Sequence, residues 1–110
     1  MREIYAHYRI PVEKHKRKSR PKFCSELKPY SRGRTNDFTP HTKGGATVCL
    51  LVDDANQLLA EAWSYCSHSD TFSYKIGRTI ARNRATIKAK ERIADLQADA
   101  FKKALHENHV

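Results

Sequence analysis

The sequence predicts an α+β fold in which a small antiparallel sheet packs against two C-terminal helices. Three features indicate this class: an alternating segment at the N-terminus, two apolar runs joined by turn-forming residues near the middle, and helical periodicity toward the C-terminus. At 110 residues the chain has room for a single domain, residues 1–110. We expect that domain to include a long basic loop at about residues 12–45.

The first element is a strand over residues 3–10. Ile4, Ala6, Tyr8 and Ile10 fall on one side of this segment, and Glu3, Tyr5, His7 and Arg9 fall on the other. Such alternation predicts a half-buried strand, which Pro11 ends.

The connection over residues 12–45 is poor in aliphatic residues, rich in Pro, Gly, Ser, Lys and Arg, and without periodicity. A connection of this length in a small domain is usually functional or disordered. We expect Phe23, Leu27, Tyr30 and Phe38 to attach parts of it to the core.

A β-hairpin follows, built from ATVCLLV, the turn residues 53–56, and QLLAEAWSYCS. The first of its strands is apolar on both faces, which predicts either a central place in the sheet or a cover on each face. The second strand places Leu59, Glu61, Trp63 and Tyr65 on one side and Leu58, Ala60, Ala62 and Ser64 on the other. We expect helix to cover one of these two faces.

Two helices complete the predicted fold. Ser69 or Asp70 is expected to cap the first helix, in which Phe72, Ile76 and Ile80 recur every four residues, and Asn83 is expected to end it. Gly77 is expected to permit close approach of this helix to the hairpin. The second helix is predicted over about residues 84–105, with an apolar face formed by Ile87, Ile93, Leu96, Ala100, Phe101 and Leu105.

The positive charge is concentrated in two blocks. The chain has 21 Lys and Arg against 12 Asp and Glu, a formal charge of +9. Residues 13–34 carry a net charge of +7 and residues 75–92 a net charge of +6, whereas the remainder is acidic, at −4. An even distribution would indicate solubility alone, but two concentrated blocks favour a surface for a negatively charged partner.

Helical spacing groups the second block into two stripes. Lys75, Arg78 and Arg82 share one face, and Arg84, Lys88 and Arg92 share another. Seven aromatic residues include possible stacking residues, but a core assignment explains most of them equally well, so base recognition is not inferred from them. They are Tyr5, Tyr8, Phe23, Tyr30, Trp63, Tyr65 and Tyr74. The predicted nucleic-acid or partner-binding residues are Lys14, Lys16, Arg17, Lys18, Arg20, Lys22, Arg32, Arg34, Lys75, Arg78, Arg82, Arg84, Lys88 and Arg92.

Catalytic and metal chemistry find little support in the sequence. Cys66 and His68 are weak candidates for metal ligands, because a structural zinc site normally has paired ligands of the C-x-x-C kind. Asp53 and Asp54 are explained by the predicted turn, and Asp70 by a helix cap. We therefore expect no catalytic residues and no cofactor.

The sequence also predicts a cytoplasmic protein that does not enter a membrane. The N-terminus lacks a signal-peptide core, and the longest apolar stretch, residues 46–52, is too short to span a bilayer. The three cysteines are odd in number and widely spaced, so we expect reduced thiols.

Residues 42–85, with KGGATV, the hairpin and YCSHSDTFSYKIGRTIARNRA, resemble in layout small uncharacterised proteins encoded by bacteriophages. The matching positions are Cys66, Asp70, Phe72, Lys75, Gly77, Arg78, Ile80, Ala81 and Arg84, while Asn83 stands where those proteins have glycine. The resemblance implies a role in host takeover inside the host cell. Two functions follow as expectations: a non-catalytic accessory protein that binds DNA or RNA, or an inhibitor of a host nucleic-acid enzyme or of a defence system such as CRISPR.

Overall fold

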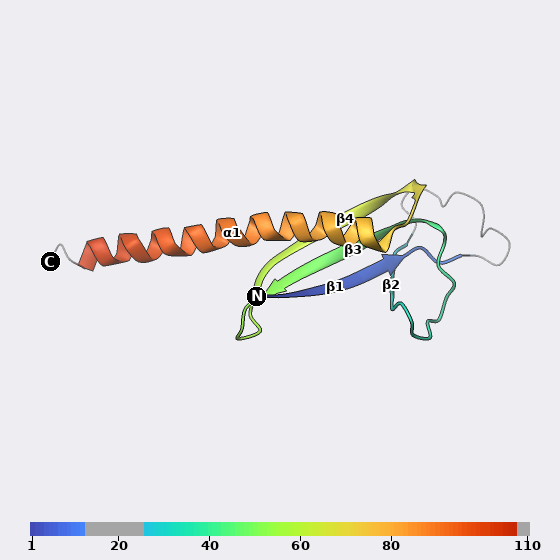
Figure 1. Ribbon diagram of the computed structural model, residues 1–110, viewed down its shortest axis with the longest axis horizontal. Helices are drawn as coiled ribbons and strands as arrows, with labels where there is room; N and C mark the ends of the chain where they lie inside the picture. The colour runs from blue at the N-terminus through green and yellow to red at the C-terminus, as the bar shows by residue number, and fades with distance from the viewer. Residues whose placement is uncertain (13–25, 108–110) are drawn as a thin grey trace.

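The computed structural model describes residues 1–12 and 26–107, which form one antiparallel sheet and one long helix (Figure 1). The four strands lie in the order β2-β1-β3-β4. The class α+β is therefore compatible with the structure, but the prediction of two C-terminal helices is wrong. The elements are β1 (Arg2–Arg9), β2 (Lys28–Tyr30), β3 (Lys43–Val52), β4 (Leu58–Thr71) and α1 (Tyr74–Glu107).

The predicted N-terminal strand and hairpin are confirmed. β3 lies between β1 and β4, as its two apolar faces indicated. In the register, Tyr5 of β1 lies opposite Cys49 of β3, which lies opposite Ala62 of β4. Tyr5 packs against the buried core, so the odd-numbered side of β1 faces the helix.

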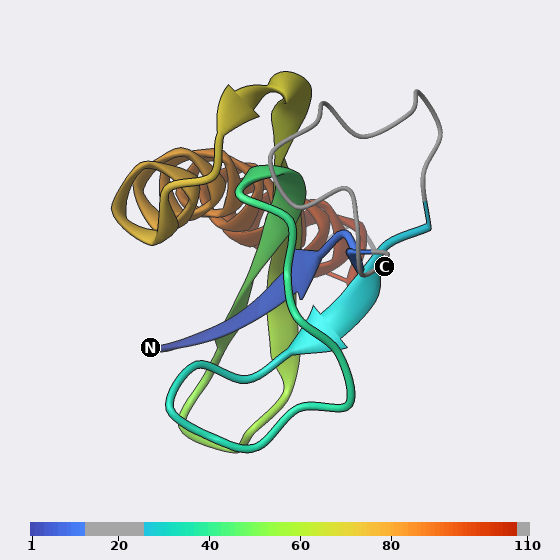
Figure 2. The same cartoon turned by 90° about the vertical axis from the view of Figure 1, so that its right-hand side faces the viewer.

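β2 is a strand that the sequence did not predict, inside the expected basic loop. It has three residues, pairs with the end of β1, and lies at the edge of the sheet (Figure 2). Pro29 lies within it, and proline is tolerated on an edge strand because no ladder donor is needed there. Of the residues expected to attach the connection, Tyr30 pairs with His7 of β1, and the Phe38 ring lies on the Tyr30 ring with centroids 5.8 Å apart. Leu27 is exposed. Phe23 lies outside the described residues.

The strand that leads into the helix is longer than predicted. β4 continues to Thr71, so Ser69 and Asp70 belong to the strand and do not cap the helix. The cap is Ser73, whose Oγ accepts a hydrogen bond from the Ile76 N–H at 3.2 Å. Asp70 is a favourable capping residue by type, but β4 is still paired with β3 beyond it, where Thr71 lies opposite Lys43.

The helix is continuous through the predicted break at Asn83. It extends over 34 residues, and Asn83 is exposed within it. Ala81 and Ala85, on either side of Asn83, are fully buried. An asparagine inside a helix costs only about 0.6 kcal/mol relative to alanine. Ala81, Ala85 and Ala89, which we call the alanine stripe, are buried against the sheet, and this burial exceeds that cost. The helix therefore does not end at Asn83.

Replacing Asn83 with alanine should raise the free energy of unfolding by about 0.5 kcal/mol, because alanine is the better helix former. Asn56 is the matched control: it has a positive φ of 60° in the β3–β4 turn, where alanine should cost about 1 kcal/mol. Urea denaturation followed by circular dichroism measures both variants. A loss of stability in Asn83→Ala would contradict a continuous helix.

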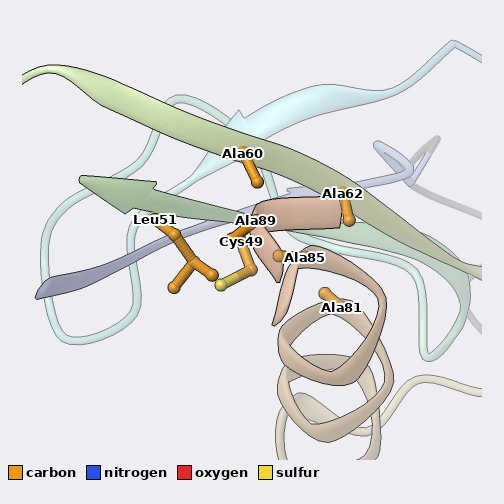
Figure 3. Close-up of a cluster of buried hydrophobic side chains, with 7 residues drawn as sticks. All are labelled: Cys49, Leu51, Ala60, Ala62, Ala81, Ala85 and Ala89. Carbon is orange, nitrogen blue, oxygen red and sulfur yellow. The ribbon is translucent and has the colours of Figure 1, made fainter. Parts of the chain in front are cut away.

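Helix and sheet meet through small residues (Figure 3). Alanines from the helix face alanines of β4 and the larger side chains of β3. Gly77 extends this close contact, since a Cβ there would lie 2.5 Å from Thr47 Oγ1, which confirms the predicted approach. The buried cluster consists of Cys49, Leu51, Ala60, Ala62, Ala81, Ala85 and Ala89.

The predicted apolar face of the helix is not the face that packs on the sheet. Ile76 and Ile87 are 61% and 58% exposed, whereas the alanine stripe is buried. An isoleucine at the contact would hold the helix too far from the strands.

Beyond Arg92 the helix leaves the sheet, and the molecule measures 73 × 26 × 20 Å (Figure 1). Within the described residues no helix has both the length and the apolar character needed to cross a membrane.

Candidate nucleic-acid interface

Three basic residues of the helix lie along the free edge of β4. β4 is the last strand of the sheet, so its outward carbonyls have no neighbouring strand to bind them. The helix supplies the donors instead. Arg84 Nη1 donates to Trp63 O at 2.8 Å, Lys88 Nζ to Glu61 O at 3.1 Å, and Arg92 Nη1 to Leu58 O at 2.9 Å.

The predicted stripe of Arg84, Lys88 and Arg92 is thus confirmed as one face, although it points along the sheet edge rather than straight into solvent. Carbonyls carry no net charge, so these contacts leave the positive charge of the stripe uncompensated. Over residues 1–12 and 26–107, the one ion pair joins the N-terminal amine to Asp54, at 3.8 Å. The edge of β4 therefore presents exposed cations that form no ion pair with a described residue.

A groove of about 540 Å³ lies along the edge of β4, beside the helix. It combines cations with apolar and aromatic surface, the combination that binds single-stranded nucleic acid. Its lining residues are Ala62, Trp63, Tyr65, Arg84, Ile87, Lys88 and Glu91.

An aromatic stack borders this groove. Tyr8 and Trp63 have ring centroids 5.2 Å apart, and Trp63 and Tyr65 stack nearly parallel at 5.9 Å and 11°. Trp63 is held further by its Nε1–H, which donates to Glu61 Oε1 at 3.0 Å. Tyr65 ends the stack and is 68% exposed, which excludes the core assignment for this residue. A nucleobase is a flat ring that can extend such a stack.

The other predicted stripe lies on the opposite flank of the helix, toward β1. The pKa of His7 is lowered first by burial and then by the charges of Arg78, Arg32 and Arg9, so these cations gather near the ring. Arg32 lies over the ring of Tyr74 at 4.7 Å, which brings a residue of the basic connection to the start of the helix. The helical cations therefore lie on two separate surfaces, one for each predicted stripe.

Arg9 is a buried cation that the sequence did not single out. It is 7% exposed and lies over the Phe72 ring at 4.3 Å. Its Nη1 donates to Tyr74 Oη at 2.8 Å, and its Nη2 donates to the His41 carbonyl at 2.7 Å. These contacts tie β1 to the connection and to the first residue of the helix, which is a structural role. Arg9 lies on the helix-facing side of β1, and that position in the alternating pattern is the sequence feature that could have indicated its burial.

The remaining predicted binding residues are placed as follows. Lys75 and Arg82 belong to the helix, and Arg34 closes a turn in which its N–H donates to Ser31 O at 3.3 Å. All three are exposed. Six further residues lie outside the described residues, namely Lys14, Lys16, Arg17, Lys18, Arg20 and Lys22.

The weak metal candidates do not come together as a site. The Cys66 thiol donates to the Asp70 carbonyl at 3.3 Å. Burial raises the pKa of Cys66, and the charge of Asp70 raises it further, so the protonated thiol dominates at neutral pH. Of the residues that the structure describes, Cys66 and His68 among them, no three His, Cys, Asp or Glu side chains are grouped as metal ligands.

Comparison with known proteins gave no match to a family model, to a curated protein sequence or to a solved structure. The resemblance to small phage proteins therefore stays a prediction. The geometry of the groove carries the functional argument.

Proposed function

We propose that this protein is a non-catalytic accessory protein that binds nucleic acid in the groove beside β4. One observation carries the proposal: Arg84 and Lys88 line the same groove as Tyr65, a residue whose side chain is exposed on the sheet face away from the helix. Cations bind the phosphate backbone of any sequence, and an exposed aromatic ring stacks on an unpaired base. Together they favour single-stranded DNA or RNA, or an unpaired segment of a longer molecule.

The basic connection supports this proposal through its charge. Arg32 and Arg34 belong to the block over residues 13–34 with a net charge of +7, and Arg32 reaches the helix start. These cations add phosphate contacts outside the groove and carry no base preference. We therefore expect strong dependence on salt and little dependence on sequence.

The stacking role of Tyr65 is tested by fluorescence anisotropy with a short labelled single strand, as DNA and as RNA, and with the matching duplex. Tyr65→Ala should weaken single-strand binding by roughly 5- to 150-fold, the range for loss of one stacked base. Tyr65→Phe keeps the ring and should bind as the wild type does. The duplex should bind both variants equally, because its bases are already stacked on one another.

Two results would count against the proposal. Undetectable binding of the wild type at low salt would remove nucleic acid as the partner. Equal affinity of Tyr65→Ala and wild type for the single strand would remove the groove as the site of base contact. Unfolding of each variant, followed by circular dichroism, checks that the fold is retained.

The alternative partner, a host nucleic-acid enzyme or defence complex, is separated by affinity capture from lysate with and without nuclease. A partner retained after nuclease treatment has bound protein directly. The structure disfavours one route to such binding, the addition of a partner strand to β4, because Arg84, Lys88 and Arg92 occupy its edge carbonyls.

A further inference from the structure

The C-terminal part of the helix extends beyond the sheet into solvent (Figure 1). We call residues 93–105 the helix overhang. Every residue of the overhang is exposed, including Ile93 at 40%, Leu96 at 57%, Phe101 at 66% and Leu105 at 46%. An isolated helix shorter than about 12–15 residues is marginal in water, because most helical stability in proteins comes from packing of an apolar face. The overhang therefore lacks the packing that the rest of the helix obtains from the sheet.

One line of apolar residues on the solvent side of the helix has coiled-coil spacing. Ile80, Ile87, Ala94 and Phe101 recur every seven residues, and all four are exposed. Within the overhang the spacing alternates between four and three residues, the pattern with which one helix packs against another. We call the residues Ala94, Ala98, Phe101 and Leu105 the helix seam.

We propose that the helix seam is covered by a second copy of this chain, with the two overhangs packed antiparallel. In this arrangement Ala94 lies opposite Leu105 of the second copy, and Ala98 lies opposite its Phe101. Each large side chain then meets a small one, so the two seams interdigitate. The pairing is independent of nucleic-acid binding, because it uses neither Tyr65 nor Lys88.

Charge beside the seam is complementary in the same arrangement. Asp95 and Lys102 lie on one flank of the seam, one heptad apart. In an antiparallel pair this flank faces the same flank of the second copy, so Asp95 of each chain lies beside Lys102 of the other. Two equivalent ion pairs result, as a two-fold symmetric contact requires.

The total charge determines the direction of the two helices. The overhang itself is neutral, with Asp95 and Asp99 balancing Lys102 and Lys103, whereas the chain carries +9. A parallel pair would place two strongly basic sheet domains side by side, where they repel. An antiparallel pair places them at opposite ends of a rod.

The test is the molar mass of the nuclease-treated, full-length protein by analytical ultracentrifugation over a range of concentrations. The wild type should approach twice 12.7 kDa as concentration rises. Phe101→Asp should raise the dissociation constant of the dimer by at least about 30-fold, the loss typical of a central aromatic residue in an interface. Leu96→Asp is the matched control, since Leu96 is also more than half exposed on the overhang but lies off the seam.

Charge reversal tests the antiparallel direction. Asp95→Lys should weaken the dimer, and the double variant Asp95→Lys with Lys102→Asp should restore it, because the two ion pairs are rebuilt with opposite sign. A wild type that stays at 12.7 kDa at every concentration overturns the proposal. So does equal weakening by Leu96→Asp and Phe101→Asp, or a double variant that is no tighter than Asp95→Lys.

Discussion

Replacing Gly45 with alanine should lower the free energy of unfolding by about 2–4 kcal/mol. Gly45 has a φ of 129°, which L-residues with a side chain rarely adopt. A Cβ there would also lie 2.8 Å from the Tyr8 carbonyl oxygen and 2.7 Å from the Phe72 ring. Strain and overlap therefore add at this position, and the backbone oxygen has little freedom to move away.

Gly33→Ala is the matched control for this substitution. Gly33 also has a positive φ, of 79°, but no atom lies within 4 Å of the position that its Cβ would take. Its loss should be only about 1 kcal/mol, from conformation alone. Urea denaturation of the two variants compares these losses, and their difference combines the overlap at Gly45 with its less accessible φ. Equal losses would show that Phe72 and Tyr8 do not confine Gly45.

The affinity of the wild type for single-stranded nucleic acid should fall steeply with salt. If six to ten phosphates are neutralised, the loss is roughly a thousand- to a hundred-thousand-fold between about 50 and 200 mM salt. Arg84→Gln with Lys88→Gln removes two charges but keeps N–H donors for the carbonyls of β4. This variant should reduce the slope of log affinity against log salt by about 1.4, at about 0.7 for each single-strand phosphate.

Lys90→Gln is the control for the salt experiment, because Lys90 is an exposed cation of the same helix that does not line the groove. Its slope should stay close to that of the wild type. An unchanged slope in the double glutamine variant would place the phosphate contacts elsewhere, on the basic connection or on the flank near β1.

The strands that could be predicted from the sequence are those with a clear periodic pattern of apolar residues. Alternation in β1 and two apolar faces in β3 placed both strands correctly, because these patterns follow from which faces are buried. The predicted break rested on the tolerance of asparagine for the left-handed conformation, but Ala81 and Ala85 are buried against the sheet and the helix continues through Asn83. The predicted apolar face was wrong because isoleucines dominate any estimate of such a face, whereas contact with Thr47 selects for the smaller stripe of Gly77 and the alanines. β2 has three residues, too few for alternation to be recognised.

The candidate site also has one part that the sequence predicts, the stripe of basic residues, and one part that it does not, the groove. Helical spacing was sufficient to group Arg84, Lys88 and Arg92, because residues three or four apart share a face in any helix. The groove depends on which strand lies at the edge and on the side of the sheet to which Tyr65 points. Those are tertiary facts, and no local pattern distinguishes an exposed Tyr65 from a buried one.

The hydrogen bonds from Arg84 and Lys88 to the β4 carbonyls hold both side chains in place before a ligand arrives. Immobilising a long cationic side chain on binding otherwise costs about 0.5–1.5 kcal/mol. Arg84 uses one of its five N–H donors on the Trp63 carbonyl, and Lys88 uses one of three on Glu61. The remaining donors are already oriented, so a phosphate bound in the groove, as we propose, would meet a preorganised pair of cations instead of two freely rotating chains.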